Sequence, residues 1–329
     1  MRTIGNSIAG FACVAFTSML LTGCLKDEIP VEPFDRGDVQ TAMVEMGDTY
    51  GKQIWFDLGT KSAVRVADKD IWDIAFDCRD GHNLVYLNAA LLAQATATSK
   101  EVLEEVNQDD IDNAFFKPDH QSGAEDSLAI GDPTTGSKVY VIHRGYDTNG
   151  SDLGHIRIQF ISVVDGMYAF RWGPIGGTEV FTSQVMKDAQ YNVVGFSFTT
   201  HEAVLTEPPK ANWDICFTQY VHVFYDPYTP YLVTGVLINP YEVEVAQTES
   251  LPFSSMTYDE AMNLAFISER NAIGYEWKYY DFDAGLYAVN PDLVYAICDT
   301  EGIYYKLHFI DFYNDAGEKG APTFEFQAL

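Results

Sequence analysis

The chain has little of what disulfide scaffolds, zinc proteins and nucleic-acid binders need. Five cysteines occur among 329 residues, and none belongs to a Cys-x-x-Cys or a tight Cys/His group. The sequence therefore excludes a disulfide-built scaffold and a zinc site of ordinary spacing. Basic residues are also scarce, with 20 Lys and Arg against 48 Asp and Glu and a net charge of −28. Because basic patches bind nucleic acids and anionic lipid surfaces, this balance opposes binding to either.

The common catalytic signatures are missing as well. There is no Gly-x-Ser-x-Gly, no His-Glu-x-x-His and no phosphate-binding glycine loop. Gly173–Gly177 is predicted to be a turn that links two halves of the chain. Among 48 acidic residues, neighbouring carboxylates arise by chance and identify no acid–base pair. The sequence predicts that the protein is not an enzyme.

Long apolar runs are confined to the N-terminus. The stretch from Ile8 to Leu21 follows Met1-Arg2 and ends at Thr22-Gly23-Cys24. It is too short to cross a bilayer core of about 30 Å, and no later run approaches about eighteen residues. A positive start, a short apolar core and small residues before a cleavage site indicate a secretory signal peptide over residues 1–23.

Leu21-Thr22-Gly23-Cys24 resembles the lipobox of bacterial lipoproteins, in which the cysteine is acylated, commonly with palmitate, and becomes the first mature residue. Acyl chains on Cys24 would anchor the protein at about 0.8 kcal/mol for each buried methylene group. Lys26-Asp27-Glu28 resembles the signal that sends Bacteroidetes-type lipoproteins to the outer face of the outer membrane, or is simply part of a solvated tether. We expect a tether over residues 24–48 and a lipid-anchored protein exposed at the cell surface.

Strand patterns dominate the rest of the chain. Ile71–Phe76 alternates large apolar residues with small or polar ones, as a strand with one buried face does. Short runs of this kind, separated by Gly, Asp and Asn clusters, predict a mostly β, antiparallel fold. Two short helices are predicted, over Ser99–Val106 and Asp259–Phe266. Residues 117–138 are polar, contain Pro and Gly, and are predicted to be a mobile loop.

Four blocks of sequence occur twice in the same order. The pairs are Phe56–Leu58 with Phe196–Phe198, Trp72–Phe76 with Trp213–Phe217, Val139–Ile142 with Val294–Ile297, and His155–Ile161 with Tyr304–Ile310. A period near 150 residues indicates a domain duplication rather than a solenoid. We therefore predict two duplicated halves, residues 49–180 and 181–329.

The Trp-Asp-Ile-x-Phe blocks have the character of core strands. If Trp213–Thr218 is extended, alternation places Trp213, Ile215 and Phe217 on one side and Asp214, Cys216 and Thr218 on the other. Trp and Phe bury large areas, so packing explains the block better than a ligand role does. The two aspartates, Asp73 and Asp214, are expected to accept hydrogen bonds from a turn. Cys78, Cys216 and Cys298 are expected to be small buried hydrophobic residues.

At these blocks the chain resembles the HmuY family of surface lipoproteins that bind haem. The resemblance extends over the hairpin Val294–Phe309 and the terminal stretch from Phe312 to Phe324, and is strongest over residues 190–329. It is fainter over residues 50–175. The resemblance implies an HmuY-like β fold, haem as the bound ligand, and passage of haem to an outer-membrane transporter.

Haem requires an axial ligand and an apolar slot. The likeness is strongest in the second half, where His222 lies among aromatic residues, so His222 is the candidate ligand of the haem iron. Other candidates for the site are Met256, Met262, Tyr220, Tyr225 and Tyr228. The competing interpretation is that His222 is an ordinary, partly buried strand residue.

A second function is open to the same fold. Exposed tyrosines such as Tyr225, Tyr228 and Tyr231 would suit a glycan or a protein partner if the haem site has been lost. The excess of acidic residues makes electrostatic steering of a dianionic porphyrin to the surface poor. A fold alone does not decide between the two functions.

Overall fold

The computed structural model describes residues 36–136 and 139–329, and Arg36–Leu329 form one unit. The expected signal peptide and Cys24 lie outside the described residues. Within them, no helix is both long and apolar enough to cross a membrane.

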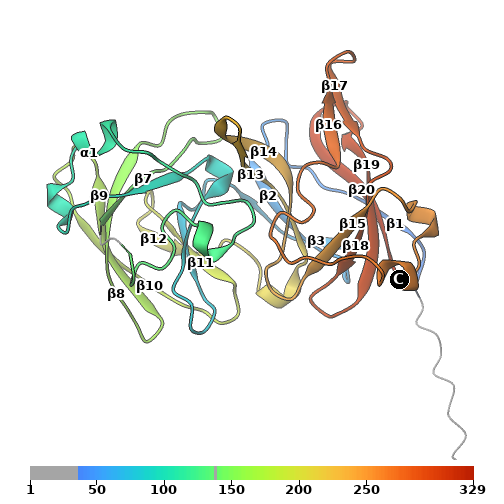
Figure 1. The fold of residues 1–329 in the computed structure, drawn as a ribbon, viewed down its shortest axis with the longest axis horizontal. Helices are drawn as coiled ribbons and strands as arrows, with labels where there is room; N and C mark the ends of the chain where they lie inside the picture. Colours follow the sequence, from blue (N-terminus) through green and yellow to red (C-terminus); the bar gives the residue numbers. More distant parts are fainter. Residues whose placement is uncertain (1–35, 137–138) are drawn as a thin grey trace, which may run out of the picture. The chain divides into compact units, whose positions relative to one another are not determined.

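Strands dominate the described chain and helices are short (Figure 1). The strands are β1 (Gln40–Met43), β2 (Lys52–Asp57), β3 (Ser62–Asp68), β4 (Ile74–Asp77), β5 (Val85–Leu87), β6 (Gln94–Ala97), β7 (Val139–His143), β8 (His155–Val164), β9 (Met167–Pro174), β10 (Phe181–Met186), β11 (Val193–Ser197), β12 (Glu202–Val204), β13 (Ile215–Tyr225), β14 (Tyr228–Ile238), β15 (Glu244–Thr248), β16 (Lys278–Asp281), β17 (Leu286–Val289), β18 (Val294–Cys298), β19 (Tyr304–Tyr313) and β20 (Lys319–Ala328). The helices are α1 (Asp109–Asp112) and α2 (Tyr258–Ala261), with 3₁₀ turns η1 (Ala89–Leu91), η2 (Leu103–Glu105), η3 (Glu125–Ser127), η4 (Lys210–Asn212) and η5 (Phe253–Ser255).

The strands form two β-sandwiches with separate cores. Sandwich A combines the sheets β10-β9-β8-β7-β6 and β12-β11-β4-β5, and its core includes Phe76, Phe170 and Phe196. Sandwich B combines β1-β20-β19-β18-β15 and β14-β13-β2-β3, and its core includes Phe217 and Phe324. All the sheet neighbours pair antiparallel. The predicted mostly β, antiparallel fold with two short α-helices is confirmed.

The two sandwiches have the same order of strands but exchange a hairpin. β4 and β13 follow the two Trp-Asp blocks and occupy matching places in their sheets. The hairpin β2–β3 precedes β4 in the chain but pairs with β13, whereas β11–β12 precedes β13 and pairs with β4. A boundary near residue 180 therefore does not separate the folded bodies. Sandwich A comprises β4–β12, and sandwich B comprises β1–β3 together with β13–β15 and β18–β20, while the hairpin β16–β17 forms a separate two-stranded sheet.

A buried aspartate fixes each exchanged hairpin. Asp214 Oδ2 accepts a hydrogen bond from the backbone N–H of Leu58 at 2.8 Å, and Asp73 Oδ2 accepts one from Phe198 at 2.7 Å. The backbone N–H groups of Asp73 and Asp214 donate to the carbonyls of Phe196 and Phe56, both at 2.9 Å. The expectation that the two aspartates accept hydrogen bonds from a turn is confirmed, and the turn belongs to the exchanged hairpin.

A matching asparagine follows the second strand of each pair. Asn88 Nδ2 donates to the carbonyls of Lys69 and Trp72, and Asn239 Nδ2 donates to those of Lys210 and Trp213. Both asparagines are fully buried. Each holds the segment that leads into the Trp-Asp block, so the duplicated blocks share their polar contacts as well as their strands.

Several expectations need correction. The tether is shorter than residues 24–48, because Gln40–Met43 pairs with β20 and the next residues, Val44 and Met46, are buried. Trp213 does not share a side with Ile215 and Phe217, because β13 begins only at Ile215. Trp213 packs instead with Trp55 and Cys216.

The first helix prediction was wrong, because no α-helix forms over Ser99–Val106, whereas the second was right in place but too long. Only the 3₁₀ turn η2 forms within Ser99–Val106, and α2 ends at Ala261, well before Phe266. The stretch predicted as a mobile loop contains η3 and the buried carboxylate of Asp119. Cys78 and Cys216 are buried as expected, whereas Cys298 is half-buried.

Replacing Asn239 by Ala is expected to lower the free energy of unfolding by about 2–4 kcal/mol, because it leaves the carbonyls of Lys210 and Trp213 buried without a donor. Urea denaturation of the mature protein, followed by circular dichroism, measures this. Asn149→Ala, at an exposed turn, is the matched control and should change stability little. Equal midpoints for the two variants would contradict the structural role of Asn239.

Candidate functional site

The hairpin β13–β14 distinguishes the two sandwiches. Its strands have 11 residues each, whereas the matching strands β4 and β5 have 4 and 3. The additional length extends past the end of β2, which pairs with β13 only over Ile215–Phe217 (Figure 1). Because sandwich A forms the same sheet without this extension, the residues on it are the first place to look for a function.

His222 lies on the extended part of β13, opposite Tyr231 on β14. Its ring makes edge contacts with Phe224 and Tyr275, with centroids 4.7 and 5.1 Å apart. The Nδ1 atom is buried and has no hydrogen-bond partner. The imidazole is thus held by aromatic rings and leaves a nitrogen without a partner.

A cavity of about 190 Å³ lies beside His222. Three of the residues that line it have a buried polar atom without a partner: Tyr220 Oη, His222 Nδ1 and Asn271 Oδ1. Buried polar groups are normally hydrogen-bonded. Three such atoms at one cavity therefore indicate a place that takes up polar groups from a ligand or from water.

Burial lowers the pKa of His222, and the nearby His120 lowers it further, while Glu276 opposes both. His222 is consequently neutral at pH 7, the form in which imidazole binds a metal. Burial also raises the pKa of Tyr220, so its phenol stays protonated. Neither side chain of the pair brings a negative charge to the cavity.

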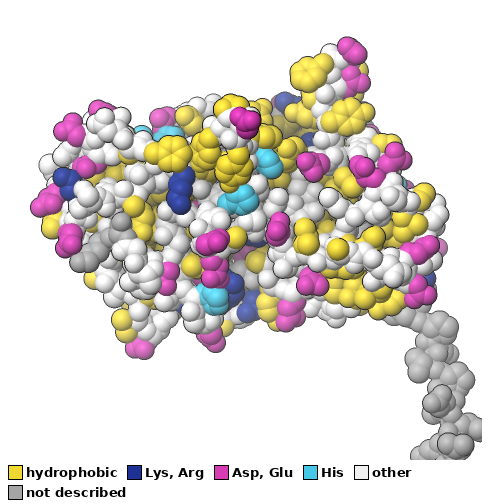
Figure 2. Space-filling view, viewed as in Figure 1, with side chains coloured by type: hydrophobic (Ala, Val, Ile, Leu, Met, Phe, Trp, Pro, Cys, Tyr) yellow, Lys and Arg dark blue, Asp and Glu magenta, His cyan; other side chains and the backbone are white. Residues whose placement is uncertain are grey.

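Aromatic residues with a second histidine surround the tip of the hairpin. The ring centroid of Tyr225 lies 6.3 Å from that of His120 and 6.1 Å from that of Tyr228, and Tyr228 contacts Phe115. Tyr225 is 68% exposed. Figure 2 shows hydrophobic side chains gathered on this face, with histidines beside them. We call Phe115, Tyr225, Tyr228 and Tyr231 the aromatic surface.

Sequence reasoning missed His120 because it lies in the predicted loop, far from His222 in the chain. The loop is held against β13 by the side chain of Gln121, whose Oε1 accepts from the N–H of Val223 at 3.3 Å. No local pattern indicates this contact. In the sequence, only the His-Gln-Ser stretch within a polar loop could have indicated that His120 belongs to the site.

The two methionine candidates do not join His222. Met256 is 2% exposed and packs with Ala261, Val294 and Ala296, whereas Met262 is 44% exposed. Neither lines the His222 cavity. Among residues 36–136 and 139–329, no group of three or more His, Cys, Asp or Glu is arranged to hold a metal ion.

Two sandwiches with an exchanged hairpin and a histidine beside exposed aromatic rings describe a β-sandwich binding protein. The family described as HmuY protein matches residues 49–326, so the chain belongs to the HmuY family. This family is one of binding and uptake proteins.

Two solved structures are similar over most of their length. Apo PinO from Porphyromonas gingivitis has 12% identity and a TM-score of 0.36, with 89% of this chain and 98% of that chain covered. The apo HmuY analog of Tannerella forsythia has 8% identity and a TM-score of 0.25, with the same two shares, 89% and 98%. No curated protein matches the chain significantly.

Replacing Glu276 by Gln should lower the pKa of His222, and His120→Ala should raise it, because the carboxylate of Glu276 favours the imidazolium and His120 opposes it. A pH titration of the imidazole protons by NMR measures both shifts. Glu318→Gln, in the β19–β20 turn, is the matched control and should leave His222 unchanged. Identical titration curves for all the variants would show that neither group acts on His222.

Proposed function

We propose that the protein is a cell-surface lipoprotein that binds haem and passes it to an outer-membrane transporter. The observation that carries the proposal is His222, neutral and ringed by aromatic side chains on a hairpin that only sandwich B extends. Membership of the HmuY family supports haem as the ligand. The proposed anchor is acylated Cys24.

The residues around His222 suit a flat, iron-containing ligand. A neutral imidazole nitrogen can serve as an axial ligand, and aromatic rings stack on a porphyrin. His120 lies beside Tyr225 of the aromatic surface, with ring centroids 6.3 Å apart, so it is our candidate for the other axial ligand. The cavity of about 190 Å³ is smaller than the roughly 300–1,000 Å³ of typical ligand pockets. Most of the porphyrin would therefore lie over the aromatic surface.

Charge does not favour this ligand. With a net charge of −28, the protein repels the propionates of haem, so affinity has to come from ligation and stacking. Added salt screens this repulsion. Haem should consequently associate faster at high ionic strength, the opposite of a protein that steers its ligand electrostatically.

Haemin titration of the mature protein tests the proposal. The wild type should give a saturable Soret band, and His222→Ala should weaken binding about tenfold or more, a loss of at least about 1.4 kcal/mol. Tyr225→Ala should cost less, because stacking is weaker than ligation. His120→Ala should change the spin state seen in the visible spectrum if this residue supplies the other ligand.

His143→Ala is the matched control, because His143 pairs with Asp152 in sandwich A, and it should bind haemin as the wild type does. Saturable binding with an unchanged spectrum in His222→Ala would assign the ligand elsewhere. Weak, nonsaturating spectra in the wild type would overturn haem binding.

Replacing Cys24 by Ser should abolish acylation and release the protein from the membrane, because no described helix can span a bilayer. Partitioning into a detergent phase, compared for the wild type and the variant, measures this. Retention of the processed variant in the membrane fraction would show that another element provides the anchor.

One observation favours the alternative, a glycan- or protein-binding surface protein without haem. Exposed aromatic rings continue beyond the His222 region onto the hairpin β16–β17, where Phe282 is 88% exposed. Broad aromatic platforms suit sugars and protein surfaces. Failure of saturable haemin binding would make this the better function.

A further inference from the structure

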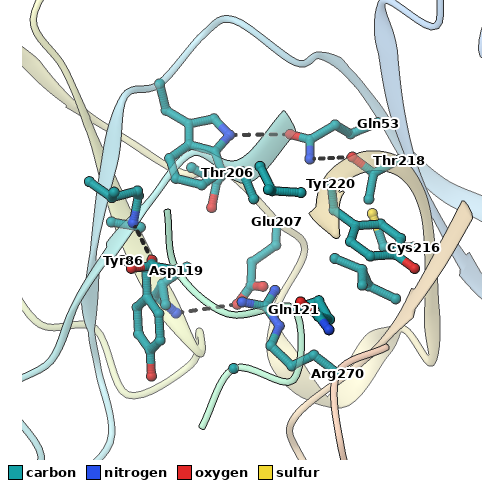
Figure 3. Close-up of a pocket in the computed structure, with 18 of the residues that line it drawn as sticks. Gln53, Tyr86, Asp119, Gln121, Thr206, Glu207, Cys216, Thr218, Tyr220 and Arg270 are labelled. Carbon is teal, nitrogen blue, oxygen red and sulfur yellow. Dashed lines mark hydrogen bonds between the residues drawn. The ribbon is translucent and has the colours of Figure 1, made fainter. Parts of the chain in front are cut away.

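A second cavity, of about 90 Å³, lies between the two sandwiches (Figure 3). Its walls come from both: Ala75 and Tyr86 belong to strands of sandwich A, and Cys216 and Tyr220 to β13 of sandwich B. A larger cavity of about 350 Å³ adjoins it and shares Tyr86, Glu207 and Arg270. The inner cavity does not include His222, but it shares Tyr220 with the cavity beside His222 and is also lined by His120.

Three residues that line the inner cavity have a buried polar atom without a partner: Tyr220, which also lines the cavity beside His222, and two residues with nitrogen donors. The nitrogen donors are Nε of Arg270 and Nε1 of Trp213, whose side chain is 1% exposed. Both atoms carry a hydrogen and neither can accept a hydrogen bond. Leaving a buried donor unpaired costs about 1–3 kcal/mol. The molecule that satisfies them must therefore present acceptor oxygens.

The acids in the cavity do not serve as these acceptors. Glu207 Oε1 accepts from the backbone N–H groups of Asn192 and Val193, at 2.7 and 3.3 Å. The oxygens of Asp119 accept from Leu87 and Ala129, both at 2.7 Å. In the described part of the chain, no hydrogen bond or ion pair joins Arg270 to either acid, although Figure 3 shows its guanidinium pointing toward Glu207.

A glycine is needed for Arg270 to reach this position. A methyl group at Gly123 would lie 2.6 Å from Cδ of Arg270, and Gly123 has a φ of +72°. The loop of Gly123 is tied to Arg270 by the bond from the Arg270 N–H to the Ser122 carbonyl at 3.1 Å. The loop thus closes over the arginine and aims its side chain into the cavity.

We infer that the cavity between the sandwiches binds a small carboxylate, with Arg270 and the indole N–H of Trp213 as its donors. The planar guanidinium matches the two oxygens of a carboxylate better than any other common acceptor group. At roughly 30 Å³ for each water, about 90 Å³ holds two or three water molecules, or one anion of formate or acetate size.

The neighbouring acids make this binding depend on pH. Burial raises the pKa of Glu207 to about 7 and that of Asp119 to about 6. A bound anion favours the protonated form of both, so acetate binding has to take up a proton above about pH 7, where Glu207 is otherwise charged. Above that pH its affinity should fall by up to about tenfold for each pH unit. The other titratable or charged groups around the two cavities are His120, Tyr86, Tyr220, Cys216, Asp77, Arg79, Glu125 and Glu269.

Titration of the mature protein with sodium acetate tests the inference, with sodium chloride at equal ionic strength as the reference. Tryptophan fluorescence and calorimetry report binding, because Trp55, Trp72 and Trp213 line the cavity. At pH 6 the wild type should saturate with acetate. Arg270→Gln should weaken binding about tenfold or more, and Trp213→Phe, which keeps an aromatic ring, severalfold.

Trp277→Phe is the matched control, because the Trp277 indole nitrogen is also buried without a partner but lies in the core of sandwich B. It should bind acetate as the wild type does. If circular dichroism shows that Arg270→Gln does not fold, the acetate affinities of Trp213→Phe and Gly123→Ala are measured instead. The inference would be overturned if acetate binding did not saturate at pH 6 or if chloride gave an equal response. It would also be overturned if the folded cavity variants bound acetate as tightly as the wild type, or if a crystal soaked in acetate held only water in the cavity.

Discussion

The hydrogen bond between each buried aspartate and the hairpin of the other repeat is the contact on which the arrangement of the two sandwiches depends. Asp73 and Asp214 immediately precede β4 and β13, and each accepts the backbone N–H of the residue that follows an exchanged strand. Burial raises the pKa of Asp214 to about 7, so its charged form is costly and its hydrogen bonds are needed to hold it in place. Asp73 has an additional partner, since Arg144 donates to both of its oxygens. Both aspartates therefore accept the hairpin N–H group, but only Asp73 is also paired with an arginine.

The exchange brings polar side chains from both repeats to the junction. Gln53, on the exchanged hairpin, donates to Thr218 and accepts from Trp72, and Asn192 donates to Asn239. Gln53, Trp72 and Thr218 line the inner cavity, and Asn192 lines the larger cavity beside it. A junction made of polar groups, rather than of apolar side chains alone, leaves room for a small ligand between two independently packed cores.

Duplication also shows where the two repeats differ. Both repeats need the same strands to complete their sandwiches, so the extension of β13 and β14 is not required for the sheet. It positions His222, Tyr225 and Tyr231 away from the shared part of the fold, and the cavity beside His222 is formed with the segment around Asn271 and Tyr275. A stable framework of this kind can gain or change a ligand on the extension without loss of its cores.

The sequence by itself determined the β class, the duplicated blocks and the hydrogen-bonding role of their aspartates, and it named His222 and Tyr220, which the structure places at one cavity. These follow from strand periodicity and from residues close together in the chain. Only the tertiary structure decided which hairpin completes which sheet, that Trp213 leaves the sandwich B core, and that His120, Asn271 and Arg270 line cavities. The reason is physical: Gln53 meets Thr218 across 165 positions and Gln121 meets Val223 across 102, and no local pattern encodes such pairings. They are chosen by the packing of whole sheets, in which every buried polar group has to find its partner.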